Sequence, residues 1–323
     1  MNLVRISLLV ILGMSFNSVG TLAGDFSTYQ DHHVSIAGET PINDEQNFKS
    51  TIDGILAVYR PLIQHNFGAK LVFESDWNSP EENASADKRD EGKEWVVELY
   101  GGLVRNAKLT EDEYTLVVCH ELGHFLGGFP FKVELGFDNS WAADEGSADY
   151  YATHICTRKL WGTDLATNAT YRAKAYPAIR AYCDTIYQAE FDQDFCYRVM
   201  TTSHSYYSKV DGSQVSITRR DHRVRHTPLF DYDYPSPQCR VDISFSGALC
   251  NIPNDDGVIP GLKSWHDNGL DITERFVEAQ KDAFKYSCQA QKQSNPDQTV
   301  LVGARPKCWF VEDYQMPTDN GKQ

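Results

Sequence analysis

Two histidines and a glutamate stand close together in the segment TLVVCHELGHFLGG, residues 115–128. His120 and His124 are four residues apart, and Glu121 directly follows the first histidine. On an α-helix, residues four apart share a face, so both imidazoles can reach one ion. Zinc takes nitrogen and oxygen ligands in a tetrahedron, and a catalytic site leaves one position for water. The spacing therefore predicts a zinc site with His120 and His124 as ligands and Glu121 as the base that accepts a proton from this water.

A third ligand is expected on the next helix, in the block DEGSADYY. Glu145 begins this block's helical part, and Asp149 lies four residues further on the same helical face. We expect Glu145 to complete a His-His-Glu site, and Asp149 to accept the free ring N–H of a ligand histidine, with His120 as the first choice. An acidic first helical turn, favoured by the helix dipole, is the competing interpretation. It does not explain Asp149, which lies deeper in the helix.

Capping residues predict the helices that hold these side chains. Thr110 and Glu113 form a capping box, so a helix should begin there, and Gly127 with Gly128 should end it. Ser140 is expected to cap the second helix, WAADEGSADYYATHICTRKLW.

The flanking segments predict strands first and helices afterwards. Apolar residues at helical spacing predict a helix over 43–66 with a kink or end at Pro61, and β-forming residues predict extended segments at 69–77, 83–89 and 94–104. The last segment could be an edge strand that binds an extended peptide or an ordinary central strand. Further helices are expected over three ranges: 169–187, 190–208 and 271–289. This order favours an α+β fold.

The two blocks that carry the expected ligands, HELGH and an E-x-x-x-D helix about twenty residues later, resemble the gluzincin metallopeptidases, the clan of thermolysin. The chain is also similar to a group of exported bacterial gluzincin-like proteins. That likeness spans about residues 94 to 310, in the blocks WVVELYGGLVRN, LVVCHELGHFLGG, WAADEGSADYYAT, PSPQCRVDISFSGALC and GARPKCWF. The resemblance implies an α+β, zincin-like fold with a small N-terminal mixed sheet, an active-site helix and a largely helical C-terminal lobe.

The chain also departs from several gluzincin and related patterns. It lacks the multiple membrane helices of the prenyl-protein processing enzymes and the GAMEN-like block of aminopeptidases. The residues after His124, FLGGFPFK, supply no third histidine of the metzincin kind. The resemblance therefore supports neither prenyl-protein processing nor an aminopeptidase.

For function, the resemblance implies one zincin-like metallopeptidase domain over residues 24–323, with an N-lobe at about 24–130 and a C-lobe at about 131–323. It implies one Zn²⁺ per chain and a peptide or protein substrate, cleaved as by an endopeptidase with Glu121 as general base. The alternative is a non-catalytic relative that binds peptide or cell-wall material.

A further donor should stabilise the oxyanion that forms during such a reaction. The family pattern places a histidine where Tyr234 stands, before the PSPQCR turn, so Tyr234 is the first choice as a second catalytic residue. The other candidates in the C-terminal half remain open: His204, Tyr206, Tyr207, His222 and His226.

The N-terminus predicts export. Residues 1–23 resemble a signal peptide, with Arg5 in the positive region, an apolar run over 6–14 and small residues before position 24. The run is too short to span a bilayer comfortably. We therefore expect a periplasmic or secreted protein with no stable membrane insertion after cleavage.

Charge and cysteine content narrow the partners and the compartment. A formal net charge of −15 argues against nucleic acid as a partner, because its phosphates require cationic contacts. The eight cysteines are an even number, which favours disulfides in an oxidising compartment. Sequence cannot fix their connectivity. Proximity in the chain favours four pairs: Cys183–Cys196, Cys239–Cys250, Cys288–Cys308 and Cys119–Cys156.

Overall fold

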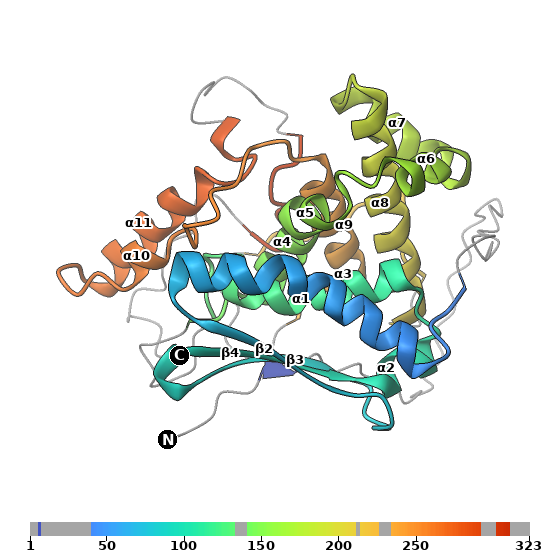
Figure 1. Cartoon of the computed structure of the whole chain (residues 1–323). Helices are drawn as coiled ribbons and strands as arrows, with labels where there is room; N and C mark the ends of the chain where they lie inside the picture. Colours follow the sequence, from blue (N-terminus) through green and yellow to red (C-terminus); the bar gives the residue numbers. More distant parts are fainter. Residues whose placement is uncertain are drawn as a thin grey trace, which may run out of the picture.

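A small mixed sheet and two helices that cover one of its faces form the N-terminal half of the structure (Figure 1). The computed structural model describes residues 6–7, 40–132, 141–210, 214–225, 234–291 and 302–310. Its strands are β1 (Ile6–Ser7), β2 (Lys70–Asp76), β3 (Ala84–Arg89) and β4 (Glu94–Tyr100), in the spatial order β1-β3-β4-β2.

Strand β4 occupies the middle of this sheet. It runs parallel to β2 and antiparallel to β3, with Val97 opposite Phe73 and Ala86. The interpretation of this segment as a peptide-binding edge strand is therefore wrong. The strand also ends at Tyr100 rather than near residue 104, because Gly101 begins the short helix α2 (Gly101–Ala107).

Helix α1 (Glu45–Phe67) confirms the helix expected over 43–66, and it continues past Pro61. Its inner face is buried at helical spacing by Phe48, Ile52, Ile55, Tyr59 and Ile63. It packs on β2 and α3. From the sheet, Trp95 stacks on Phe125 of α3, with ring centroids 5.0 Å apart. The sheet and α1 thus hold α3 from two sides.

Helix α3 (Glu111–Leu126) carries the two histidines, and both of its ends are as expected. Thr110 is its N-cap, the capping box with Glu113 is present on both sides, and Gly127 is the C-cap. Every residue from Glu113 to Leu126 is buried. A helix that is buried all round belongs to the centre of the molecule, where its polar groups must find partners.

Helix α4 (Glu145–Tyr151) packs against α3. Its N-cap is Asp144, so the helix begins later than expected; the predicted cap, Ser140, lies outside the described residues. A π-helical segment (Ala152–Cys156) and α5 (Thr157–Trp161) continue the same run of chain. Such π-helical turns often occur at functional sites.

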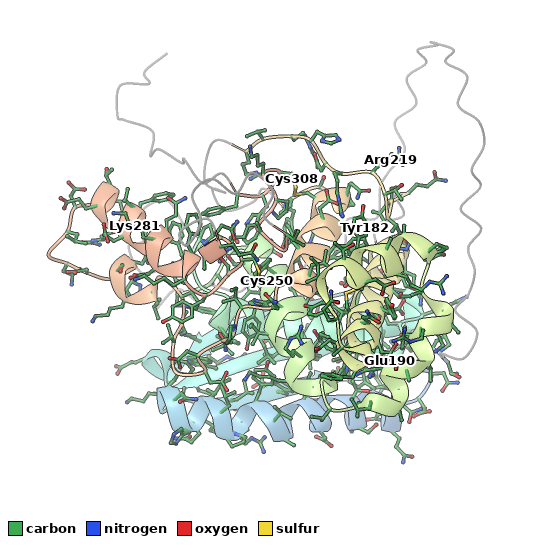
Figure 2. The ribbon with its side chains drawn as sticks, turned by 90° about the horizontal axis from the view of Figure 1, so that it is seen from above. Tyr182, Glu190, Arg219, Cys250, Lys281 and Cys308 are labelled. Carbon is green, nitrogen blue, oxygen red and sulfur yellow. A yellow bond between two sulfur atoms is a disulfide. The ribbon has the colours of Figure 1, made fainter. Side chains whose placement is uncertain are left out.

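The rest of the described chain is largely helical, and most of it lies on the side of α3 that faces away from the sheet (Figure 1). Its helices are α6 (Leu165–Lys174), α7 (Pro177–Ile186), α8 (Glu190–Val210), α9 (Pro237–Leu249), α10 (Leu262–Trp265) and α11 (Ile272–Phe284). Figure 2 shows α7 and α8, marked by Tyr182 and Glu190, on one side, and α11, marked by Lys281, on the other. A short 3₁₀ helix (Asp90–Gly92) joins β3 to β4.

Three features of this helical part differ from the sequence-based expectations. The single helix expected over 169–187 is two helices, α6 and α7, because Pro177 begins a new helix at its first turn. The last helix, α11, covers only the first part of the range 271–289. Helix α9 was not expected. The α+β class, with a small mixed sheet and a largely helical C-terminal part, is confirmed.

Four disulfides cross-link the chain, and two of the four expected pairs are right. Cys119–Cys156 and Cys183–Cys196 are as expected, whereas the other four cysteines pair as Cys239–Cys308 and Cys250–Cys288. Cys239–Cys250 was wrong because these residues stand at opposite ends of α9. Eleven residues of helix span about 16 Å, well beyond the reach of a disulfide.

No helix among the described residues is both long and apolar enough to cross a membrane. The four disulfides are compatible with an exported protein.

Candidate metal centre

His120, Glu121 and His124 lie together on the buried α3. Each of the three side chains offers a ligand atom within 4.8 Å of the other two. The His120 and His124 rings meet edge to face, with centroids 4.8 Å apart. All three residues are at most 4% exposed. The helical spacing that predicted a shared face is therefore realised inside the protein.

Glu145 of α4 brings a second carboxylate to the same point. Its Oε2 is 3.2 Å from His120 Nε2, and its Oε1 is 3.7 Å from His124 Nε2. Despite this proximity, His120 Nε2 and Glu145 Oε2 have no hydrogen-bond partner, and both are buried. Zinc–nitrogen bonds of about 2.0–2.1 Å place the ligands of a tetrahedron about 3.3 Å apart. The spacing of these two atoms fits that geometry.

The other ring nitrogen of each histidine is engaged. His120 Nδ1 lies 2.8 Å from Asp149 Oδ1, and His124 Nδ1 lies 2.9 Å from the carbonyl oxygen of Ala143. Both acceptors favour a proton on Nδ1 and leave Nε2 as the lone-pair nitrogen. The expected pairing of Asp149 with His120 is present.

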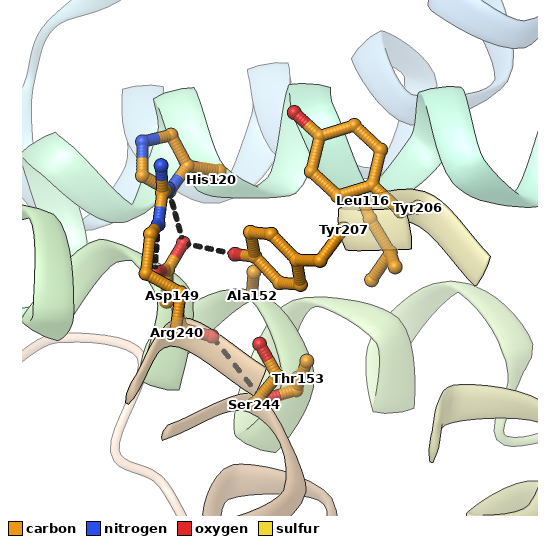
Figure 3. A pocket seen from close by; sticks show the side chains of 9 residues that line it. All are labelled: Leu116, His120, Asp149, Ala152, Thr153, Tyr206, Tyr207, Arg240 and Ser244. Carbon is orange, nitrogen blue, oxygen red and sulfur yellow. Dashed lines mark hydrogen bonds and ion pairs between the residues drawn. The ribbon is translucent and has the colours of Figure 1, made fainter. Parts of the chain in front are cut away.

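Asp149 is the centre of a buried polar network (Figure 3). Arg240 of α9 donates from Nε to Oδ2 at 2.7 Å and from Nη2 to Oδ1 at 2.8 Å. Tyr207 of α8 donates its hydroxyl to Oδ1 at 2.8 Å. Three helices thus converge on one carboxylate, which fixes the orientation of the His120 ring.

The two glutamates beside the histidines differ in their protonation. Burial raises the pKa of Glu121 to about 7, and both of its oxygens lack a hydrogen-bond partner. Burial also opposes the charge on Glu145, but Lys132 and the two histidines lower its pKa below the usual range. Glu145 is therefore the carboxylate suited to hold a cation, and Glu121 the one suited to exchange a proton near neutral pH.

The two histidines also differ. Burial lowers the pKa of His124 to about 3, so its ring is neutral, as a ligand must be. Burial acts in the same direction on His120, but Asp149 and Glu145 outweigh it and raise the pKa to about 9. The two carboxylates thus favour a positive charge at this point, and a divalent ion would supply such a charge.

Close packing of α3 and α4 brings the two histidines and Glu145 together. A Cβ atom added to Gly123 would lie 2.7 Å from the Cα of Ala148, so only glycine permits this approach. At the start of α4, Asp144 accepts a bond from the Trp309 indole at 3.0 Å. A Cβ on Gly146 would collide with the same indole.

A small pocket adjoins His120 and is lined by residues of five helical segments, among them Tyr206, Tyr207, Arg240 and Ser244. Tyr207 is bound to Asp149, whereas the hydroxyl of Tyr206 makes no hydrogen bond to a described residue. Two of the candidate oxyanion donors, Tyr206 and Tyr207, therefore share this pocket with His120.

The remaining candidates that the structure describes do not line this pocket. The ring of Tyr234 is 5.9 Å from the guanidinium carbon of Arg240, and this residue does not line the pocket. His204 packs edge to face on Tyr176. His222 is exposed, and His226 lies outside the described residues. The choice of Tyr234 stays a prediction.

Sequence reasoning missed two cations of the site. Arg240 stands inside the quoted PSPQCR block, but nothing in its spacing links it to Asp149. Lys132 lies in FPFK and donates to Glu145 Oε1 at 2.6 Å. Both residues stand among aromatic or apolar neighbours in the sequence. A charged residue that is buried in such surroundings needs a counter-charge, and this need was the only sign of their role in the sequence.

No family model, no curated protein and no solved structure matches the chain. The assignment of a function therefore depends on the chemistry of the site.

Proposed function

We propose that this protein is an exported zinc peptidase in which His120, His124 and Glu145 hold the metal and Glu121 is the general base. One observation carries the proposal. Two buried ligand atoms, His120 Nε2 and Glu145 Oε2, face each other at 3.2 Å without a hydrogen bond, and the engaged Nδ1 atoms leave both imidazole Nε2 atoms available. Buried polar atoms without partners are rare, and a metal ion would satisfy them.

A bound zinc ion would supply Lewis acidity at the point where these ligands meet. The chain's own groups would do the rest. Glu121, with a pKa raised to about 7, can accept a proton from the attacking water and pass it to the leaving amine. Asp149, held by Arg240 and Tyr207, fixes the His120 ring. Tyr206, which lines the pocket with His120, offers a hydroxyl for a developing oxyanion.

The peptide bond as substrate follows from the resemblance of HELGH and the Glu145-to-Asp149 block to gluzincins. The separation of the two carboxylate roles also supports hydrolysis, because a purely structural zinc site would have no use for a protonatable glutamate beside it. Export follows from the N-terminal segment and agrees with four disulfides and no free cysteine among the described residues.

The test compares oxidised, zinc-loaded protein with its Glu121→Gln variant on a mixed peptide library. We expect cleavage by the first and a loss of at least about 1000-fold in the second, with zinc content measured in both. Equal zinc content would assign the loss to the base. If a folded, zinc-loaded protein cleaves nothing, peptide binding without catalysis replaces the peptidase. If the protein holds no zinc, the metal centre itself is wrong.

A further inference from the structure

Lys132 brings a positive charge to the proposed metal centre. Its Nζ lies 2.6 Å from Glu145 Oε1, and the two side chains are 16% and 5% exposed. The backbone around it is fixed as well: the Lys132 N–H donates to Ala142 O at 2.7 Å, and Phe131 bridges to Ala143. This lysine is therefore built into the structure beside the ligands.

The two oxygens of Glu145 have unlike surroundings. Oε1 accepts from Lys132, whereas Oε2 has no hydrogen-bond partner and faces His120 Nε2. Arg240 contributes a second positive group, with Nη2 3.8 Å from Oε2, but Asp149 already pairs with it. Lys132 is thus the cation whose charge is balanced by the ligand glutamate itself.

We propose that Lys132 is a built-in counter-ion of the metal centre, which neutralises Glu145 in the metal-free protein and weakens the binding of a divalent cation. The proposal depends on the metal site of the proposed function, and it adds a control on how tightly that site holds its ion. Lys132 is a positioning residue and need not touch a substrate.

Electrostatics fixes the sign of both effects. A carboxylate buried without a partner strongly destabilises a fold, so the ammonium group should stabilise the metal-free protein. The same positive charge lies within a few ångströms of any ion bound at Oε2 and repels it. A lysine with only a structural role would act differently, because its removal would weaken folding and metal binding together.

The consequence is a site that binds zinc less tightly than it would without Lys132. With Lys132 in place, the protein can fold before it meets zinc and can exchange the ion afterwards. Without this charge, the folded state would depend on bound metal, as it does for small structural zinc domains.

The experiment measures two quantities on the full oxidised chain: the melting temperature after removal of metal, and the zinc affinity by competition with a chromophoric chelator. Lys132→Met should lower the metal-free melting temperature by about 5 °C or more and raise zinc affinity at least about tenfold. Lys132→Arg, which keeps the charge, should resemble the parent protein in both. Lys70→Met is the matched control, because Lys70 pairs with Glu94 at 2.9 Å on the surface, and neither quantity should change.

Unchanged or weaker zinc affinity in Lys132→Met would overturn the counter-ion role while leaving the metal centre intact. If that variant does not fold without metal, Lys132→Gln keeps a donor and removes the charge, and its zinc affinity should still exceed that of the parent. Zinc binding by the variants but not by the parent would support the proposal. Absence of zinc binding in every variant would overturn the metal centre and this proposal together.

Discussion

At the residue scale, the site contains two buried glutamates whose pKa values are shifted in opposite directions. Glu121 and Glu145 are both at most 4% exposed and approach the same pair of histidines. Burial opposes the charge on both glutamates, but Lys132 and the two histidines outweigh it at Glu145 and lower its pKa, whereas burial raises the pKa of Glu121. Identical side chains thus have pKa values shifted in opposite directions by their surroundings.

The hydroxyl of Tyr206, in the pocket with His120, leads to a residue-scale prediction. Tyr206→Phe should lower kcat about 100-fold with little change in KM, because a donor to the oxyanion acts mainly in the transition state. Steady-state kinetics on the best library peptide would measure this effect.

Tyr234→Phe is the natural comparison, since the sequence favours Tyr234 and the pocket favours Tyr206. A large loss in Tyr234→Phe and none in Tyr206→Phe would reverse the assignment. A loss in both would indicate that Tyr234 acts through Arg240.

The individual site residues could be predicted only where helical spacing relates them. His120, His124, Glu145 and Asp149 follow from two four-residue intervals, and the His120–Asp149 contact was expected and is present. Arg240 and Lys132 reach the site from distant or loop segments, so no periodicity could locate them. The pKa differences depend first on burial and then on the charges that surround each group, and neither could be predicted from the sequence.

At the element scale, α3 and α4 approach each other so closely that a glycine is needed at their contact. Gly123, inside HELGH, faces Ala148, and Gly247 of α9 faces Thr153 in the same way. The glycine of the motif is therefore a packing residue that sets the distance between the histidines and Glu145.

Gly123→Ala should test this packing. The added methyl group would lie 2.7 Å from the Ala148 backbone, so we expect destabilisation of about 1–3 kcal/mol and weaker zinc binding. Denaturant unfolding and a zinc titration would measure the two effects.

Gly54→Ala provides the matched control for the intrinsic preference of helices for alanine. Gly54 lies in the middle of α1, and a Cβ there meets nothing within 4 Å. This change should stabilise the protein by about 0.5–1 kcal/mol. If Gly123→Ala were equally stabilising, the close approach of α3 and α4 would not be a constraint.

Among the elements, those with strong local signals were predicted best. Helix α3 carries its start and stop in Thr110, Glu113 and Gly127, and its bounds were predicted closely. Helix α9 escaped prediction because its serines and glycine have low helix propensity, and packing against α4 and α8 stabilises it instead. Ser140 was a plausible cap, but Asp144 starts the helix.

At the scale of the whole molecule, disulfides connect the neighbours of the site residues. Cys119 precedes His120 and pairs with Cys156 at the end of the π-helical segment. Cys239 precedes Arg240 and pairs with Cys308, which precedes Trp309. The Cys239–Cys308 bond therefore links the neighbours of two residues: Arg240, which pairs with Asp149, and Trp309, which donates to Asp144.

Removal of the Cys239–Cys308 bond should weaken zinc binding as well as the fold. A Cys239→Ser, Cys308→Ser double variant should lose about 4 kcal/mol of unfolding free energy, because the bond closes a loop of 69 residues. Its zinc affinity should fall, as measured by chelator competition.

The matched control removes Cys183–Cys196, which joins α7 to α8 and closes a loop of 13 residues. That double variant should lose about 3 kcal/mol and keep its zinc affinity. Parallel losses of affinity in both variants would mean that global stability, and not the local bond, controls the site.

The contact between Trp309 and Asp144 also constrains the order of events during synthesis. The ligand helices α3 and α4 leave the ribosome early, but the indole that holds the N-cap of α4 lies 165 residues further along the chain. Cys308 is equally late. When a ribosome has made the first 300 residues, it has therefore not yet made the indole and the cysteine that hold the start of α4 and the start of α9. Completion of this packing is thus a late step, which requires both residues and the oxidation of Cys308.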